Sequence, residues 1–318
     1  MKPLTIEALL QTKGHILALE PLNQSSLQRP IQDATISSPG LVLAGFTDRF
    51  PKGRIQVLGE TEIRFLYSLE AEQQRQSLET FFSLDMPAVV VTKGQKVPAL
   101  LIEIGEAHGV PVIRSGLKTG DFYRRLQPYL EEQLAPTTTM HGSLADVYGV
   151  GLLFVGRSGI GKSECVLDLV ERGHRLVADD LVYISKRGND VLIGRGHELQ
   201  QHHMEIRGIG IIDVKALFGI RAARQQKRIE VVVQLEDWHE QGKYDRTGLD
   251  SSETEVLGVK LPKVVVPLNA GKNITVLSEV VAMNHLLKYS GVHSAELFNK
   301  RLQTAMQPLR DYLEEDYE

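Results

Sequence analysis

The residues best suited to chemistry begin with a glycine-rich segment in the second half of the chain. This segment reads Gly156-Arg157-Ser158-Gly159-Ile160-Gly161-Lys162-Ser163, which matches the phosphate-binding pattern G-x-x-x-x-G-K-[S/T]. Glycines at this spacing let backbone N–H groups approach a polyphosphate at the positive end of the following helix. Lys162 can bring a mobile charge to the β- and γ-phosphates, and the Ser163 hydroxyl can ligate Mg²⁺. The pattern predicts a nucleotide site in preference to a glycine-rich turn with an exposed lysine.

A magnesium-dependent site also needs carboxylates near the phosphates, and two pairs of acids qualify. Asp179 and Asp180 end an apolar run that follows the glycine-rich segment closely. Glu236 and Asp237 end a second apolar run later in the chain. The pattern favours the first pair without excluding the second, and either pair could instead be a solvated strand end.

A third feature is the segment Met204-Glu205-Ile206-Arg207-Gly208-Ile209-Gly210-Ile211-Ile212-Asp213. In an extended strand side chains alternate between faces, so Glu205 and Arg207 are expected on the same face. Such a pair could hold a metal ion and a phosphate oxygen. Taken alone, it is more simply a surface ion pair beside a flexible turn.

The elements that must position these residues follow from the apolar pattern. In the first half, strands are predicted over residues 41–45, 54–59, 87–92 and 110–115. A predicted helix over 98–108 joins the last two strands, which gives a β–α–β unit in a small parallel sheet. A helix over 121–134 closes this half, and a polar stretch with a proline follows it. We therefore expect an N-terminal α/β domain over 1–133 and a second domain over 134–318.

In the second half, an apolar strand over 152–155 enters the glycine-rich segment and a helix over 163–172 leaves it. Further strands are predicted at 181–184, 190–193, 229–235 and 263–267, and further helices at 278–288 and 294–315. The fold class is α/β in both halves.

Composition excludes several classes of protein. The chain has 318 residues, and 36 Lys and Arg against 40 Asp and Glu give a net charge of −4. A general nucleic-acid binder would be basic over a whole face. No apolar stretch is long enough for a transmembrane helix, and the N-terminus does not resemble a secretory signal. The single cysteine, Cys165, cannot form an internal disulfide, which favours a cytoplasmic location.

Three further groups of residues could form sites. The histidines His197, His202 and His203 lack the spacing of a helical zinc site, so a loop near the active site is the simpler interpretation. Cys165 is expected to be a buried small residue of the helix. A basic cluster contains Arg221, Arg224, Lys227 and Arg228. We expect this cluster to be a solvated face, with contact to a protein substrate or an effector phosphate as the alternative.

Taken together, the motifs resemble one family, HPr kinase/phosphorylase. The additional motifs are Met140-His141-Gly142-Ser143-Leu144-Ala145-Asp146-Val147-Tyr148-Gly149-Val150-Gly151 and Gly173-His174-Arg175-Leu176-Val177-Ala178-Asp179-Asp180. The resemblance covers about residues 136–290 closely, and the first 130 only through the family's two-domain layout. It implies an N-terminal α/β domain with a regulatory or assembly role and a C-terminal P-loop kinase domain.

The resemblance also implies a function. Such enzymes use ATP to phosphorylate a serine of the phosphocarrier protein HPr, and many run the reverse phosphorolysis, which yields pyrophosphate. They are typically cytoplasmic homohexamers. The implied catalytic residues are His141, Lys162, Asp180 and Arg246, and the implied Mg²⁺ ligands are Ser163 and Glu205. Asp180 would be the general base in phosphorylation and the general acid in the reverse direction.

The chain departs from the family in one loop. Where the family usually reads Pro-Val-Arg-Pro-Gly-Arg, this chain reads Pro267-Leu268-Asn269-Ala270-Gly271-Lys272. With one arginine replaced by an amide and the other by lysine, we expect a kinase with weak phosphorylase activity. The competing functions are a P-loop kinase of a small metabolite and a non-catalytic regulatory protein controlled by a nucleotide.

Overall fold

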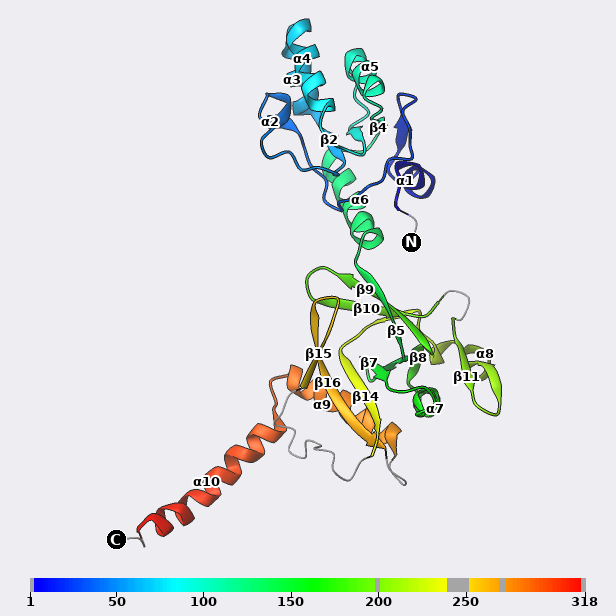
Figure 1. Cartoon of the computed structure of the whole chain (residues 1–318), viewed down its shortest axis with the longest axis vertical. Helices are drawn as coiled ribbons and strands as arrows, with labels where there is room; N and C mark the ends of the chain where they lie inside the picture. Colours follow the sequence, from blue (N-terminus) through cyan, green and yellow to red (C-terminus); the bar gives the residue numbers. More distant parts are fainter. Residues whose placement is uncertain (1–2, 198–200, 239–251, 269–272, 316–318) are drawn as a thin grey trace. The chain divides into compact units, whose positions relative to one another are not determined.

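The structure is a computed structural model that describes residues 3–197, 201–238, 252–268 and 273–315 (Figure 1). The chain divides into two compact units, Met1–Ala135 and Pro136–Glu318, and each is described by itself. Both are mixed α/β, as predicted from the sequence. Among the described residues, no helix is both long and apolar enough to cross a membrane.

The N-terminal unit is built on a four-stranded sheet of order β1-β4-β3-β2. Its strands are β1 Leu19–Pro21, β2 Gln56–Leu58, β3 Val89–Val91 and β4 Val112–Ser115. Strands β2, β3 and β4 run parallel, and β1 pairs antiparallel with β4. The central strand β3 is entirely apolar because helices bury both faces of the sheet.

The helices of this unit are α1 Ile6–Lys13, α2 Gly40–Leu43, α3 Glu60–Ser68, α4 Ala71–Phe82, α5 Ala99–Ala107 and α6 Thr119–Gln133. Helices α2 to α5 share one apolar core, which contains Leu78 and Phe81. Helices α1 and α6 share another core, which contains Ile6 and Phe122. The strand predicted over 41–45 was wrong, because this segment begins in helix α2. A short apolar run alone does not distinguish a strand from a buried helical turn.

The C-terminal unit is built on a six-stranded sheet of order β15-β16-β14-β7-β6-β8. Its strands are β6 Ser143–Val147, β7 Val150–Val155, β8 Arg175–Ala178, β14 Val231–Asp237, β15 Ser252–Val256 and β16 Val259–Leu268. Strand β7 lies between β6, which is antiparallel to it, and β14, which is parallel. Its side chains alternate: Phe154 packs in the core that includes the helix after β7, and Leu153 packs in a second core.

A second sheet, of order β13-β10-β9-β5, contributes to that second core. Its strands are β5 Thr137–His141, β9 Leu181–Arg187, β10 Val191–Arg195 and β13 Gln226–Arg228. Strands β11 His203–Ile206 and β12 Gly210–Asp213 form a separate hairpin. Short helical segments α8 Val214–Phe218 and η2 Ile220–Ala222 follow the hairpin.

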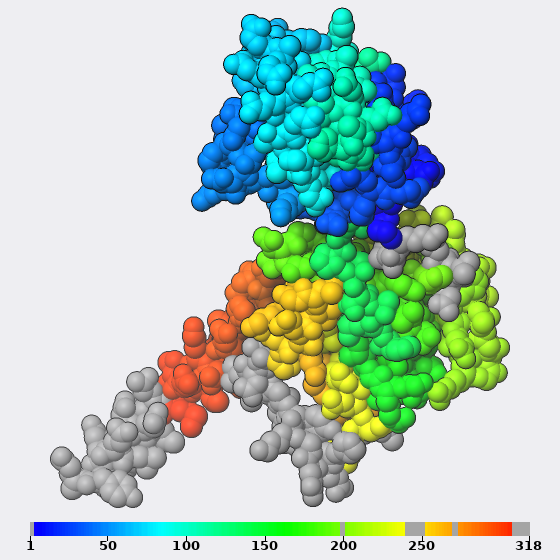
Figure 2. All heavy atoms as spheres, turned by 45° about the horizontal axis from the view of Figure 1, so that its top comes forward, coloured from blue at the N-terminus to red at the C-terminus, as the bar shows by residue number. Residues whose placement is uncertain are grey.

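Three longer helices complete the unit: α7 Lys162–Glu171, α9 Ile274–Tyr289 and α10 Ser294–Glu315. The helices predicted at 163–172 and 294–315 are confirmed, and the one predicted at 278–288 begins four residues earlier. Helix α10 extends away from the sheets of its unit (Figures 1 and 2). In its first half Leu297, Phe298 and Leu302 are exposed, which leaves an apolar face without cover from the described residues.

Candidate active site

The glycine-rich segment forms the loop between β7 and α7, where a strand's carboxyl end meets a helix N-terminus. Gly156, Gly159 and Gly161 have φ values of 152°, 75° and 102°, which L side chains rarely adopt. A Cβ on Gly156 would also lie 2.6 Å from the Leu235 carbonyl oxygen. Gly161 is the N-cap of α7 and has no side chain to cap it. The loop thus leaves the first N–H groups of α7 available to an anion.

Lys162 lies across this loop. Its Nζ donates hydrogen bonds to the carbonyl oxygens of Gly156, at 3.2 Å, and Arg157, at 3.1 Å. The ammonium group is therefore held beside the backbone that would surround the phosphates. This placement supports the phosphate-binding role predicted for Lys162.

Asp179 follows β8 and connects two hydroxyl groups of the site. Its Oδ1 accepts hydrogen bonds from Ser143 at 2.5 Å and from Ser163 at 3.0 Å. Burial raises the pKa of the Asp179 carboxyl, while these two hydrogen bonds act in the opposite direction. A carboxylate and the loop hydroxyl therefore meet at the start of α7. These are hard oxygen donors of the kind Mg²⁺ prefers, so the residues fit that ion.

The next residue, Asp180, has a different environment. Its backbone is left-handed, with φ 64°, and its side chain is 73% exposed. His141, the last residue of β5, is also exposed, and its Nδ1 lies 3.9 Å from Asp180 Oδ1. The Gly142 N–H donates to the Asp180 carbonyl, which fixes the two segments together. The structure thus places near one another two of the residues that the resemblance assigns to catalysis.

The β11–β12 hairpin brings Arg207 to the loop. Glu205 and Arg207 are exposed while Met204 and Ile206 are buried, so the predicted shared face of the two charged residues is present. A Cβ built on Gly159 would lie 2.7 Å from the guanidinium carbon of Arg207. Arg207 therefore lies directly beside the phosphate-binding loop. The described residues place no group of three or more His, Cys, Asp or Glu together, so the metal role of Glu205 remains a prediction.

The second pair of acids contributes a contact that sequence reasoning missed. Asp237, at the end of β14, accepts two hydrogen bonds from Arg157, at 2.6 Å from Nε and 2.9 Å from Nη2. Because β14 lies beside β7, this pair ties the loop to the neighbouring strand. The sequence shows two acids at the end of an apolar strand. It does not indicate that Arg157 is the partner of Asp237.

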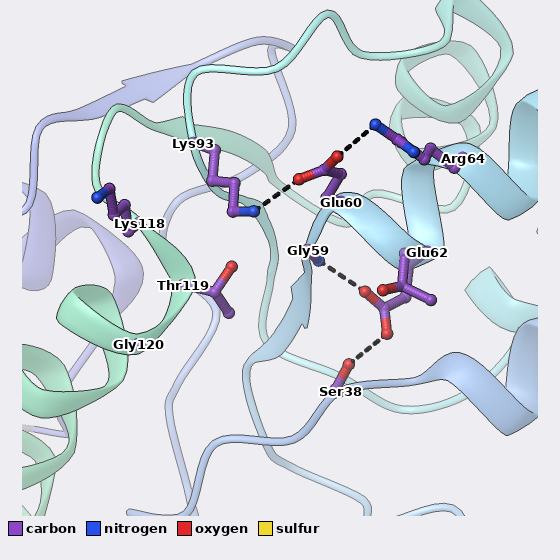
Figure 3. A pocket seen from close by; sticks show the side chains of 10 residues that line it. Ser38, Gly59, Glu60, Glu62, Arg64, Lys93, Lys118, Thr119 and Gly120 are labelled. Carbon is purple, nitrogen blue, oxygen red and sulfur yellow. Dashed lines mark hydrogen bonds and ion pairs between the residues drawn. The ribbon is translucent and has the colours of Figure 1, made fainter.

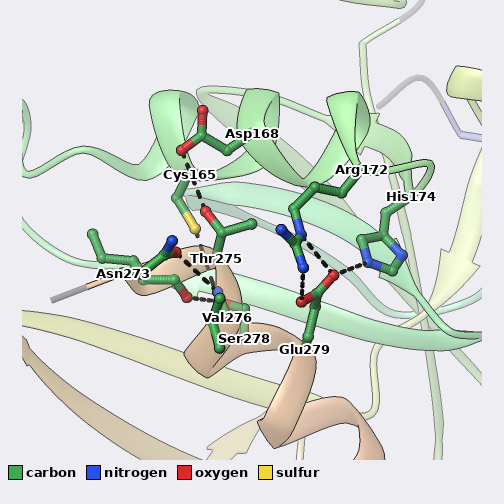
Figure 4. A network of polar contacts seen from close by, with 10 residues as sticks. Cys165, Asp168, Arg172, His174, Asn273, Thr275, Val276, Ser278 and Glu279 are labelled. Carbon is green, nitrogen blue, oxygen red and sulfur yellow. Dashed lines mark hydrogen bonds and ion pairs between the residues drawn. The ribbon is translucent and has the colours of Figure 1, made fainter.

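The far end of helix α7 is fixed to α9 by a polar network (Figure 4). Glu279 accepts from Arg172 at 2.9 and 2.7 Å and lies 3.1 Å from His174 Nε2. The Arg172 guanidinium, followed by His174, holds the pKa of Glu279 at about 2 against the opposing effect of burial. Cys165 is buried as predicted, and burial raises the pKa of its thiol to about 12. A thiol with that pKa is protonated near neutral pH and is no nucleophile.

Several predicted site residues lie outside the described residues. They are Arg246 and the loop residues Asn269, Ala270, Gly271 and Lys272. The roles predicted for Arg246 and for this loop therefore stay predictions.

Two of the histidines lie at the start of the β11–β12 hairpin. His202 comes just before β11, and His203 is the first residue of that strand. The Nδ1 atom of His203 lies 3.0 Å from the Gln201 carbonyl oxygen.

The basic cluster is partly neutralised. Arg224 donates to the buried Asp146 at 2.7 Å, and Lys227 donates to Glu230 at 2.7 Å. Arg221 and Arg228 are exposed. Two of the four charges are thus engaged in ion pairs within the unit, and the other two have the exposure predicted for a solvated face.

Comparisons with known proteins match most of the chain to one family. The model of the HPr Serine kinase N terminus matches residues 4–130, and that of the HPr Serine kinase C-terminal domain matches residues 132–302. HPr kinase/phosphorylase of Chloroherpeton thalassium is 45% identical over 95% of this chain and 92% of its own length. The protein of that name from Geobacillus kaustophilus is 46% identical over 88% of this chain and 90% of its own length. A solved structure of the Hpr(Ser) kinase/phosphatase from Coxiella burnetii aligns with TM-score 0.46 and 34% identity, over 51% of this chain and 98% of that one.

Proposed function

The chain belongs to the HPr serine kinase family, and from that premise we propose that it uses ATP to phosphorylate a serine of the phosphocarrier protein HPr. The reverse reaction, phosphorolysis of phosphoserine-HPr to give pyrophosphate, belongs to the same proposal. The family match over both units supports it.

The observation that carries the proposal is the exposure of Asp180, the residue after Asp179, whose carboxylate accepts a hydrogen bond from Ser163 of the phosphate-binding loop. A serine on the surface of a folded protein can reach a carboxylate only if that carboxylate is itself open to solvent. Asp180 would take the proton of the serine hydroxyl as its oxygen attacks the γ-phosphorus, and would return it when the direction reverses. We assign His141, whose Nδ1 lies 3.9 Å from Asp180 Oδ1, the role of orienting that carboxylate.

Other residues would bind the phosphates of ATP and neutralise the charge that develops during transfer. We assign the phosphates of ATP to the backbone of residues 156–163 and to Lys162. Arg246 would neutralise charge on the transferring phosphoryl group, as the family motif implies. Mg²⁺ bound at Ser163 and Glu205 would supply further neutralisation. Asp179 would orient the Ser163 hydroxyl, because its carboxylate already accepts that hydrogen bond at 3.0 Å.

Location and assembly are part of the proposal. A cytoplasmic location rests on the single cysteine, and a homohexamer on the family. The exposed apolar side chains of α9 and α10, among them Val280, Phe298 and Met306, support contact with further chains. We also infer that nucleic acid is not a partner, because the net charge is −4. We infer the same of membranes, because no apolar stretch of the sequence approaches the length of a transmembrane helix.

The test is incubation of the full chain with labelled ATP, Mg²⁺ and purified HPr, followed by phosphoserine mapping. We expect label on one serine of HPr, its loss in Asp180→Asn, and its retention in Asp190→Asn, which changes an exposed acid in a turn of the same unit. Turnover of ATP onto a small metabolite without HPr, or ATP binding without turnover, would contradict the proposal.

A further inference from the structure

The N-terminal unit contains a cavity of about 610 Å³ at the carboxyl edge of its parallel strands (Figure 3). Gly59 follows β2, Lys93 follows β3 and Lys118 follows β4, and all three residues line the cavity. In open α/β sheets, ligands bind outside this edge of the strands. The volume also falls within the usual range for small-molecule sites.

The walls of the cavity are held in place before any ligand arrives. The Thr92 and Thr119 hydroxyl groups lie 2.7 Å apart, which joins the loops after β3 and β4. The Lys93 N–H also donates to the Leu117 carbonyl at 2.7 Å and fixes Lys93 at φ 64°. A Cβ on Gly59 would lie 3.3 Å from Thr119 Oγ1, so a side chain there would intrude on the cavity.

The charges that line the cavity leave a positive excess. Glu60 is shared between Lys93, at 2.7 Å, and Arg64, at 2.6 Å. Glu62 accepts from the Gly59 N–H and the Ser38 hydroxyl, both at 2.8 Å. Both carboxylates therefore already have partners.

Lys118 differs from the other charged residues of the lining. It is exposed and has no ion-pair contact within 4 Å among the described residues, and it stands where the 15-residue helix α6 begins. Its charge contributes, after that of Arg124, to lowering the pKa of Asp121 in the first turn of α6. Figure 3 shows Lys93, Lys118 and Thr119 on the side of the cavity opposite Glu62 and Arg64. An anion entering on the Lys118 side would meet two ammonium groups and the positive end of a helix.

We propose that this cavity binds a small organic phosphate, with the phosphate group at Lys93 and Lys118 and the organic part along Gly59 and Ser38. The cavity is too large for inorganic phosphate alone, and the Ser38 hydroxyl, which donates to Glu62, still has an oxygen that can accept from a hydroxyl group of the remainder. The site is separate from the phosphate-binding loop and does not depend on the proposed function.

The test is equilibrium dialysis of the full chain against radiolabelled inorganic phosphate. The phosphate-binding loop is first saturated with Mg²⁺ and a non-hydrolysable ATP analogue, so that phosphate bound there is not counted. We expect one further phosphate per chain, displaced by glycerol phosphate and not by glycerol. Lys118→Gln should weaken this binding about tenfold, because it removes a charge-assisted contact.

Lys52→Gln is the matched control, since Lys52 is exposed and lies before β2, at the opposite edge of the sheet. It should leave binding unchanged, and the melting temperatures of both variants should equal that of the parent. No binding once the loop is saturated would overturn the proposal, as would equal losses in the two variants. Failure of glycerol phosphate to displace phosphate would overturn the assignment to an organic phosphate.

Discussion

The two units place polar groups at the same topological position, the carboxyl ends of parallel strands, but hold them by different means. Around β7 the backbone itself forms the site, through three glycines at positive φ and the uncapped start of α7. In the N-terminal unit, side chains from three successive loops line the cavity, and Glu60 neutralises part of their charge. A backbone site depends on a short local sequence and is therefore recognisable in it. A side-chain site depends on the packing of loops that are distant in sequence.

The largest expected effect is that of changing Asp180, one of the two adjacent acids at the backbone site. Asp180→Asn should retain nucleotide binding, because residues 156–163 supply most phosphate contacts. It should lose about 10²–10⁴ in the rate of transfer to HPr, the usual contribution of a positioned acid or base. Single-turnover transfer and nucleotide affinity measure the two effects separately. Transfer near the parent rate would assign the base to another residue.

The second prediction compares a glycine from each site. Gly159→Ala places a Cβ at φ 75° and against the Arg207 guanidinium, so nucleotide affinity should fall tenfold or more. Gly120→Ala, in the lining of the N-terminal cavity, is the control, because a Cβ there meets no atom within 4 Å. It should leave nucleotide affinity unchanged. Equal effects, measured by calorimetry, would contradict the view that the loop is shaped by its glycines.

The third prediction contrasts ion pairs of the two units. Glu279 is 8% exposed and holds both Arg172 and His174, whereas the Glu60 side chain is 42% exposed. Glu279→Gln should destabilise the C-terminal unit by about 1–3 kcal/mol, and Glu60→Gln by much less. Urea unfolding followed by probes in each unit would measure this difference. A Glu60 variant as destabilised as the Glu279 variant would contradict the comparison.

The contacts of Glu279 with Arg172 and His174 also make the stability of the C-terminal unit depend on pH. The pKa of Glu279 is about 2 in the folded chain, below its ordinary value of 4.5. The folded state therefore binds this proton less readily than the unfolded state, and ionised Glu279 stabilises the fold above about pH 4.5. That contribution should decline as the pH falls from 4.5 through 2, and the Glu279→Gln variant should lack this part of the decline.

The comparison also explains which features the sequence could predict. The loop at 156–163, the strand before it and helix α7 were predicted because glycine spacing and apolar periodicity are local signals. The adjacent acids were placed correctly at a strand end, but their different environments depend on Ser143 from β6, Ser163 from α7 and His141 from β5. The Arg157–Asp237 pair needed the adjacency of β7 and β14. No motif marked the N-terminal cavity, because its lining comes from loops without a shared pattern.

The smallest expected effect concerns the direction of reaction and lies in residues 267–272, of which 269–272 are outside the described residues. Phosphorolysis brings a phosphate anion to a phosphoserine, so two negative groups must meet, whereas the kinase direction begins with a neutral hydroxyl. Forked arginine donors suit the first task better than Asn269 or Lys272. Ala270 also lacks the fixed φ of the proline that the family's motif usually has at this position.

Asn269→Arg should therefore raise phosphate-driven release of pyrophosphate from phosphoserine-HPr several-fold, on the order of one charge-assisted contact. ATP-driven phosphorylation should change little. Asn269→Gln keeps the amide and lengthens the side chain, so it controls for size and should leave both rates unchanged. Robust phosphorolysis by the parent chain, unaltered by the added arginine, would show that this loop does not set the direction. A gain confined to the arginine variant would show that charge on a side chain can tune a site whose phosphate contacts are otherwise made by the backbone.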